Sequence, residues 1–191
     1  MYTIKDNLEN TIIIKNSKFI CCLYKVYDIE QVNYYLKEIR NIYKDATHYC
    51  YAYIIDNYKK FSDDNEPSGT AGSPIMQVLE KNNLNYVLCI VIRYFGGIKL
   101  GAGGLVRAYS KSVVECLNKS EKISLVKGKN ISIVFNYEDT KDIDNILKNS
   151  LIIDKVFSDK VLYKVNVEEN IINKLENKCK IIINKDIYIE K

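Results

Sequence analysis

The chain has 191 residues, a length that suggests one large domain or two small ones. Apolar residues make up 47% of the chain and charged residues 27%, which is the composition of a globular protein. The net charge of +4 and the isoelectric point of about 8.6 permit nucleic-acid binding without indicating it, because dedicated nucleic-acid-binding domains usually exceed about 9.

The first part of the chain predicts strands and helices in alternation. A tight turn at Asn16–Ser17 separates the first two strands, and Asp28 can cap the first helix, whose apolar residues recur at intervals of three and four. Ser73–Pro74 supplies an N-cap and a proline at the first helical position. The predicted strands are 11–15, 18–26, 47–55 and 86–95, the helices are 28–45, 74–82 and about 104–118, and a polar loop covers 56–72.

The second part predicts a different arrangement, with the element order βαββαβ. This order is the plan of a ferredoxin-like domain. We therefore expect an α+β protein with two domains, 1–123 and 124–191, and Lys127–Lys129 is the candidate linker. The predicted strands are 131–137, 151–157, 160–167 and 180–189, and the helices are 139–150 and 169–179.

Glycine and proline are concentrated in one region. Seven of the eight glycines and both prolines fall between Pro67 and Gly104. Glycine is useful where φ must be positive or where a ligand must approach the backbone. Ordinary tight turns are the alternative explanation, but two glycine-rich loops, each ahead of a helix, favour a binding surface.

The second of these loops predicts a site for a negatively charged group. The strand before it ends at Phe95 and a helix begins near Gly104, whose first amides have no partner within the helix. Arg93 and Arg107 add positive charge on either side. The stripe from Arg107 through Lys111 could equally be a solvated helix face. The expected anion-binding or nucleic-acid-binding residues are Arg93, Gly96, Gly97, Lys99, Gly101, Gly103, Gly104, Arg107 and Lys111.

The first loop is acidic and allows several roles. Its carboxylates could hold a divalent cation, cap backbone amides, or pair with Arg93 and Arg107, and we favour the internal pairing. His48, the only histidine, forms H-x-C with Cys50, but no further zinc ligands or orienting group are evident, so we expect a buried, hydrogen-bonded histidine. We expect no metal, no cofactor and no catalytic residue. The polar residues expected to face the site are Asp63, Asp64, Glu66, Ser68, Gly69, Thr70 and His48.

The six cysteines lie in or beside apolar stretches and form no C-x-x-C pair. We interpret them as reduced thiols of a cytoplasmic protein. The apolar runs are shorter than the roughly 20 residues that span a bilayer, so we expect no membrane association.

The two loops, FSDDNEPSGTAGSP and RYFGGIKLGAGGLVRAYS, resemble the signature of the YigZ/IMPACT family, with support from NSKFIC and DATHYCYAYI. Asn65 stands where the family commonly has glycine, and asparagine tolerates the left-handed conformation that such a turn needs. The resemblance implies an N-terminal domain similar to domain 2 of ribosomal protein S-five. It implies a C-terminal domain similar to domain V of elongation factor G.

Eukaryotic members of the family act on translational control during amino-acid starvation, with the help of an additional N-terminal domain. The resemblance therefore favours a non-enzymatic, ribosome-associated regulator that binds RNA, the ribosome or a translation-associated partner. The alternatives are an enzyme or sensor for a small phosphorylated ligand, and a protein–protein module that uses the C-terminal sheet. The sequence predicts no oligomeric state.

Overall fold

The computed structural model describes all 191 residues, which form two compact units, Met1–Ile123 and Ser124–Lys191. Each unit combines helices with an antiparallel sheet, so the predicted α+β class is confirmed. None of the helices has the length and apolar character needed to cross a bilayer.

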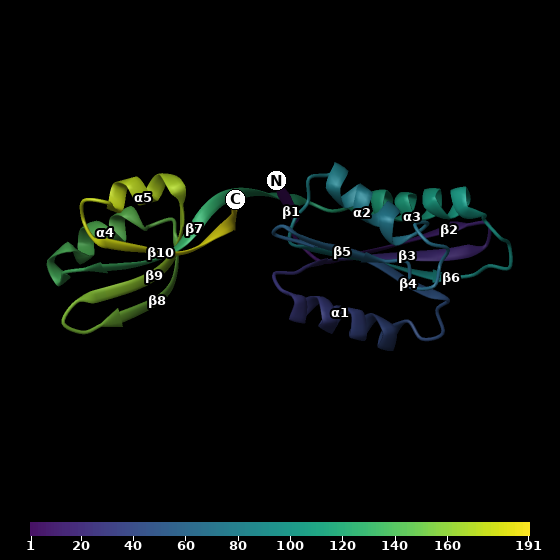
Figure 1. Ribbon diagram of the computed structural model, residues 1–191, viewed down its shortest axis with the longest axis horizontal. Coiled ribbons are helices and arrows are strands. Elements are labelled where there is room, and N and C mark those ends of the chain that lie inside the picture. The colour runs from purple at the N-terminus through teal and green to yellow at the C-terminus, as the bar shows by residue number, and fades with distance from the viewer. The chain divides into compact units, whose positions relative to one another are not determined.

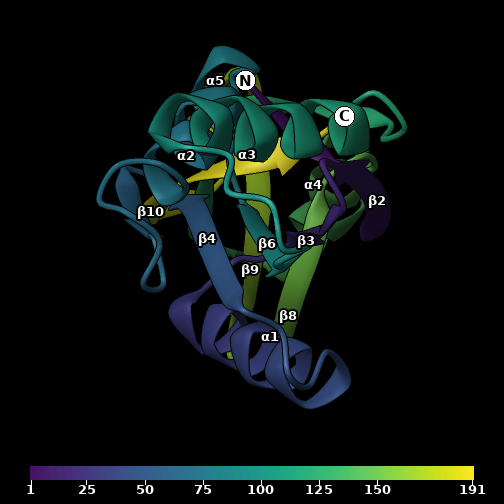
Figure 2. The same cartoon turned by 90° about the vertical axis from the view of Figure 1, so that its right-hand side faces the viewer.

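The first unit is a sheet between two layers of helix. Figures 1 and 2 show α1 on one face of the sheet and α2 and α3 on the other. The strand order is β2-β3-β6-β4-β5, and every neighbouring pair is antiparallel. The strands are β2 (Leu8–Ile14), β3 (Ser17–Lys25), β4 (His48–Ile55), β5 (Tyr58–Ser62) and β6 (Val87–Tyr94), and the helices are α1 (Ile29–Ile42), α2 (Gly72–Lys81) and α3 (Ala102–Leu117).

The middle strand explains why this unit needs helices on both sides. Val87 through Ile92 of β6 are fully buried, although successive side chains point to opposite faces. Cys89 and Val91 belong to the core that the sheet shares with α2 and α3. The expected central strand is therefore confirmed.

Several details of the first unit differ from the sequence prediction. A short strand, β1 (Tyr2–Ile4), was missed, and the chain just after it contacts the segment that follows α3, where the Lys5 N–H donates to the Glu121 carbonyl at 2.9 Å. The segment 56–72, which we predicted as a polar loop, contains the exposed edge strand β5. The sequence of this strand is largely polar and does not indicate a strand. The turn between β2 and β3 lies at Lys15–Asn16 and not at Asn16–Ser17. Both turn residues have positive φ, 44° and 63°, which suits a two-residue hairpin.

The second unit has the predicted order βαββαβ, with the strands arranged β10-β7-β9-β8. The expected linker at Lys127–Lys129 is wrong, because these residues lie inside β7, where Gly128 pairs with Glu168 on one side and Ile187 on the other. The elements are β7 (Lys122–Phe135), the 3-10 turn η1 (Tyr137–Asp139), α4 (Thr140–Ile146), β8 (Leu151–Phe157), β9 (Val161–Glu168), α5 (Glu169–Leu175) and β10 (Lys180–Glu190).

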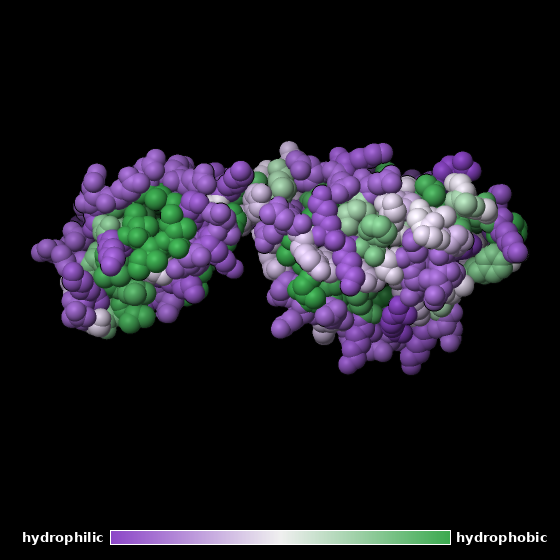
Figure 3. All heavy atoms as spheres, in the orientation of Figure 1, coloured by the Kyte–Doolittle hydropathy of each residue, from purple (hydrophilic) through white to green (hydrophobic).

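The helices α4 and α5 cover one face of this second sheet, where the buried core lies (Figure 1). Several large apolar side chains of the unit remain exposed, and Figure 3 shows a broad apolar area on it with a hydrophilic rim. The exposed apolar residues of its strands are Leu151, Ile153, Val156, Phe157, Ile182 and Ile183.

Candidate functional site

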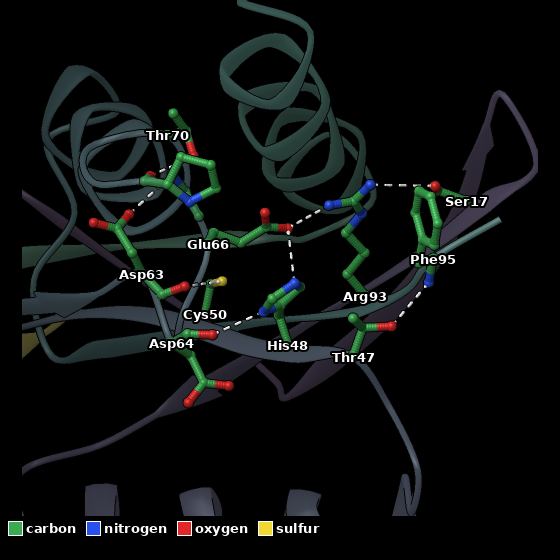
Figure 4. Close-up of polar contacts among 12 residues, drawn as sticks. Ser17, Thr47, His48, Cys50, Asp63, Asp64, Glu66, Thr70, Arg93 and Phe95 are labelled. Carbon is green, nitrogen blue, oxygen red and sulfur yellow. Dashed lines mark hydrogen bonds and ion pairs between the residues drawn. The ribbon is translucent and has the colours of Figure 1, made fainter. Parts of the chain in front are cut away.

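A buried carboxylate lies between the two glycine-rich loops. The Glu66 side chain is 3% exposed and its Oε1 accepts from Nη1 of Arg93, 6% exposed, at 2.6 Å (Figure 4). The Tyr109 hydroxyl donates to the same oxygen at 2.8 Å, and Nε2 of His48 lies 3.7 Å away. Glu66 therefore joins the acidic loop to β6, to α3 and to β4.

Arg93 is enclosed rather than exposed. Its guanidinium lies 5.5 Å from the ring centroids of Phe19 and Phe95, its Nη2 is 3.5 Å from the Ser17 hydroxyl, and its Nε has no partner. The expectation that Arg93 flanks the glycine loop as an accessible cation is therefore wrong. Two-residue alternation along β6 accounts for this, because Arg93 has the same parity as Val91 and points to the same face, toward α3.

The Asp63 side chain organises the acidic loop. Its carboxylate accepts from the backbone N–H groups of Gly69 at 2.9 Å, Ala71 at 3.0 Å and Gly72 at 2.8 Å. These three bonds fold the loop back onto itself directly before α2. Gly72 is required there, because an added Cβ would lie 2.7 Å from the backbone of Ser62.

Asp64 ties the loop to β4 and α1. Its carboxylate accepts from the Tyr49 N–H at 2.7 Å and from Arg40 at 2.9 Å. The Asp64 carbonyl lies 2.8 Å from Nδ1 of His48, so the predicted hydrogen bonding of the histidine is confirmed, but its side chain is 16% exposed and only partly buried. Asn65 follows with φ of 66°, as its tolerance of the left-handed conformation predicts.

The buried Cys50 thiol also belongs to this network. Its Sγ lies 3.0 Å from the Asp63 carbonyl oxygen and 3.3 Å from the Tyr109 hydroxyl oxygen, and the thiol is the donor in both contacts. Burial raises the pKa of Cys50 far above its ordinary value, and the nearby Glu66 carboxylate raises it further. Burial likewise raises the pKa of Tyr109. A thiol held in its neutral form is a poor nucleophile, so the H-x-C motif serves packing and hydrogen bonding.

The contacts therefore show internal pairing of the loop carboxylates, which is the role that we favoured over metal binding. Asp63 caps amides, while Asp64 and Glu66 pair with arginines, although one of these is Arg40 and not the expected Arg107. No group of three or more His, Cys, Asp and Glu side chains is arranged to hold a metal ion. The Thr70 hydroxyl donates to the Pro67 carbonyl at 2.6 Å within the loop, and Ser68 is exposed at the surface of the loop.

The glycine loop combines a close backbone contact with open main chain. A Cβ on Gly96 would lie 2.0 Å from the carbonyl carbon of Asn16, and the Gly96 N–H donates to the Ser17 hydroxyl at 3.2 Å. Gly97 and Gly101 have φ of 83° and 70° with open space around them. The helix α3 begins at Ala102, two residues earlier than expected, and no side chain caps it.

The exposed cations beside this loop are unpaired. Lys99, Arg107 and Lys111 are exposed, and none of them forms an ion pair with a carboxylate. Phe95, 46% exposed, is held at the start of the loop through its N–H, which donates to the Thr47 hydroxyl at 3.0 Å. Free positive charge, an exposed aromatic ring and exposed main chain therefore occur on one short segment.

Sequence reasoning missed the partners that fix this arrangement. Tyr109 has the helical spacing of a core residue, and nothing in its sequence context marks its hydroxyl as a donor to Glu66. Ser17 and Arg40 also escaped notice, because they are distant in sequence from both loops. The only available signal was the alternation in β6 that turns Arg93 inward and demands a buried counter-charge.

The Impact N-terminal domain matches residues 15–117, more than half of the chain and both loops. The chain belongs to the IMPACT family. IMPACT family member YvyE of Bacillus subtilis (strain 168) is 42% identical over 176 residues, which is 88% of this chain and 80% of that protein. IMPACT family member YigZ of Escherichia coli (strain K12) is 38% identical over 111 residues, which is 56% of this chain and 54% of that protein.

One solved structure is similar in fold to almost the whole chain. A crystal structure described only as that of a hypothetical protein aligns with a TM-score of 0.71 and 26% identity, over 96% of this chain and 97% of its own. The two-domain translational regulator Yih1 aligns over 62% of this chain and 47% of its own, with a TM-score of 0.34 and 18% identity, which is too distant to support an argument. Both candidate loops lie in the part of the chain that defines the family.

Proposed function

We propose that this IMPACT family member is a non-enzymatic regulator that acts in the cytoplasm. It binds RNA that is part of the ribosome or of a translation-associated complex. The proposed surface consists of Phe95 through Gly104 together with Arg107 and Lys111, and we call it the glycine-loop surface. One observation carries the proposal: the acidic loop residues are engaged internally, whereas the cations of the glycine-loop surface are exposed and unpaired.

The chemistry of this surface suits a single-stranded RNA segment. Lysine and arginine contact phosphates, and exposed aromatic rings such as that of Phe95 stack on bases without strict sequence preference. The glycines allow the sugar–phosphate backbone to approach the main chain, where the first amides of α3 also favour negative charge. Arg93 contributes indirectly, because its ion pair with Glu66 fixes the strand end from which the loop departs.

The alternative of an enzyme or sensor for a small phosphorylated ligand is less well supported. It needs Asp63, Asp64 and Glu66 as free polar groups around a phosphate. The first caps three amides and the other two pair with arginines, so little of their hydrogen-bonding capacity is left for a ligand.

The test is fluorescence anisotropy of a labelled single-stranded RNA between about 50 and 200 mM salt. Each phosphate contact contributes about 0.7 to the slope of log K against log salt, so we expect Arg107→Gln/Lys111→Gln to reduce that slope by about 1.4. The matched control is Lys37→Gln/Lys60→Gln, which removes two exposed and unpaired cations from α1 and β5 of the same unit. Absence of binding at the lower salt, or an equal loss in the control, would refute the proposal.

A further inference from the structure

The second unit contains a hollow of about 560 Å³ that the glycine-loop surface does not use. Its walls come from the end of α4 and the segment after it, the start of β8, the junction of β9 with α5, and the end of the chain after β10. All lining residues lie between 145 and 191, within one compact unit. Pockets for small ligands commonly have volumes of roughly 300–1,000 Å³, so the hollow is large enough for one.

Asparagines supply much of the polar lining. Asn145, Asn149 and Asn170 make no side-chain hydrogen bond within the protein, so their amide donors and acceptors are available. Asn166 uses its oxygen to accept from Asn130 at 2.7 Å and keeps its NH₂ group free. A primary amide offers a donor beside an acceptor, and this pattern matches the N6 and N7 edge of adenine.

Positive charge in the hollow is only partly neutralised. Lys191 pairs with Glu168 at 2.9 Å, whereas Lys148 and Lys174 form no ion pair. This contrasts with Lys155 and Lys178 of the same unit, each of which has an aspartate partner. Among the lining side chains, three lysines against one glutamate leave an excess of two positive charges, which favours an anionic ligand.

Apolar side chains complete the lining. Ile146 and Ile171 are half-buried and also pack against the core, and Leu151 is 65% exposed at the start of β8. Aliphatic faces of this kind can cover the plane of a base while amides read its edge. The hollow therefore combines the three groups that a nucleotide requires.

We propose that this hollow binds an adenine nucleotide. Lys148 and Lys174 hold the phosphate, the free asparagine amides contact the adenine edge, and the aliphatic residues cover its face. The same chemistry is presented by a free adenine nucleotide and by an adenosine residue within single-stranded RNA. The inference is independent of the glycine-loop surface, because the two sets of residues belong to different units.

The test is a ¹H–¹⁵N NMR titration of the full chain, once with AMP and once with a short oligoadenylate. We expect the side-chain NH₂ signals of Asn145, Asn149 and Asn170 to shift. We expect Lys148→Gln/Lys174→Gln to weaken the affinity about tenfold, equivalent to about 1.4 kcal/mol. Shifts with AMP identify a free nucleotide as a sufficient ligand, and shifts with the oligoadenylate alone identify an RNA residue.

The control is Lys180→Gln/Lys185→Gln, which removes two exposed and unpaired charges of the same unit that do not line the hollow. Unmoved asparagine signals with both probes would overturn the inference, as would an equal loss of affinity in the control. Shifts confined to residues 95–111 would overturn it while supporting the glycine-loop surface. Persistence of the asparagine shifts in Arg107→Gln/Lys111→Gln would support it even if the other proposal fails.

Discussion

Replacing Glu66 by methionine should destabilise the first unit strongly. The substitution removes the carboxylate 2.6 Å from Arg93 and leaves a guanidinium whose remaining hydrogen bond, to Ser17, is 3.5 Å long and whose Nε has no partner. The Tyr109 hydroxyl loses its acceptor as well. Breaking a buried pair by removing one partner typically costs about 3–5 kcal/mol, so we expect a loss of that size, with a melting temperature lower by about 10 °C.

The double variant Glu66→Met/Arg93→Met separates this cause from simple loss of packing. Replacing both charges by apolar side chains of similar volume removes the uncompensated charge, and the remaining cost is the unpaired Tyr109 hydroxyl, about 1–3 kcal/mol. We therefore expect the double variant to be more stable than Glu66→Met alone. Additive losses in the two single variants and the double would contradict this reasoning, because residues that interact directly should couple.

The single histidine gives a local assay for this prediction. The chain has one His, and His48 lies 3.7 Å from the substituted carboxylate. Its ring-proton NMR signal therefore reports unfolding of the first unit during a urea titration, whatever the second unit does. Lys5→Met, which breaks the exposed pair with Glu121, is the control and should leave the urea midpoint nearly unchanged. If the urea midpoint of Glu66→Met lies as close to the wild-type midpoint as that of Lys5→Met does, the expected loss of about 3–5 kcal/mol is refuted.

Three further predictions concern Gly96, Asp63 and Cys21. Gly96→Ala should destabilise the protein by about 1–3 kcal/mol in thermal unfolding, because the added Cβ would lie 2.0 Å from the Asn16 backbone. Gly103→Ala is the matched comparison, and it should be neutral or slightly stabilising because nothing lies within 4 Å of its added Cβ. Asp63→Ala should accelerate hydrogen exchange of the three loop amides that its carboxylate accepts from, and unchanged exchange would contradict their assignment. Burial raises the pKa of Cys21, so its stabilising contribution is complete below the ordinary thiol pKa of about 8.5 and declines at higher pH. Under reducing conditions the urea midpoint should therefore fall between about pH 8 and 10, and less steeply in Cys21→Ala.

Strongly periodic segments could be predicted from the sequence, and isolated contacts could not. The spacing of apolar residues and the cap at Asp28 were enough for α1, whose cap accepts from the Gln31 N–H at 2.8 Å. The strand β5 was missed because all but its last residue are exposed, so no apolar alternation marks it. The sequence of the acidic loop shows which carboxylates are present, but the fold determines which groups they pair with. No motif predicts that Arg40 of α1 is the partner of Asp64.

The division of charge between the two loops bears on how the glycine-loop surface would work. Glycine-rich main chain is costly to order, and a partner that had to order it would bind more weakly. Here Glu66 joins Arg93 on β6 to Tyr109 on α3, and these two elements hold the ends of the glycine loop. Gly96 is fixed in addition by its contact with the β2–β3 turn. If the proposed binding holds, the buried ion pair contributes to it without touching the ligand, because it joins the two elements that flank the loop between the exposed Phe95 and Arg107. On this argument, Glu66→Met/Arg93→Met should weaken RNA binding without lowering its salt dependence, whereas Arg107→Gln/Lys111→Gln should lower both.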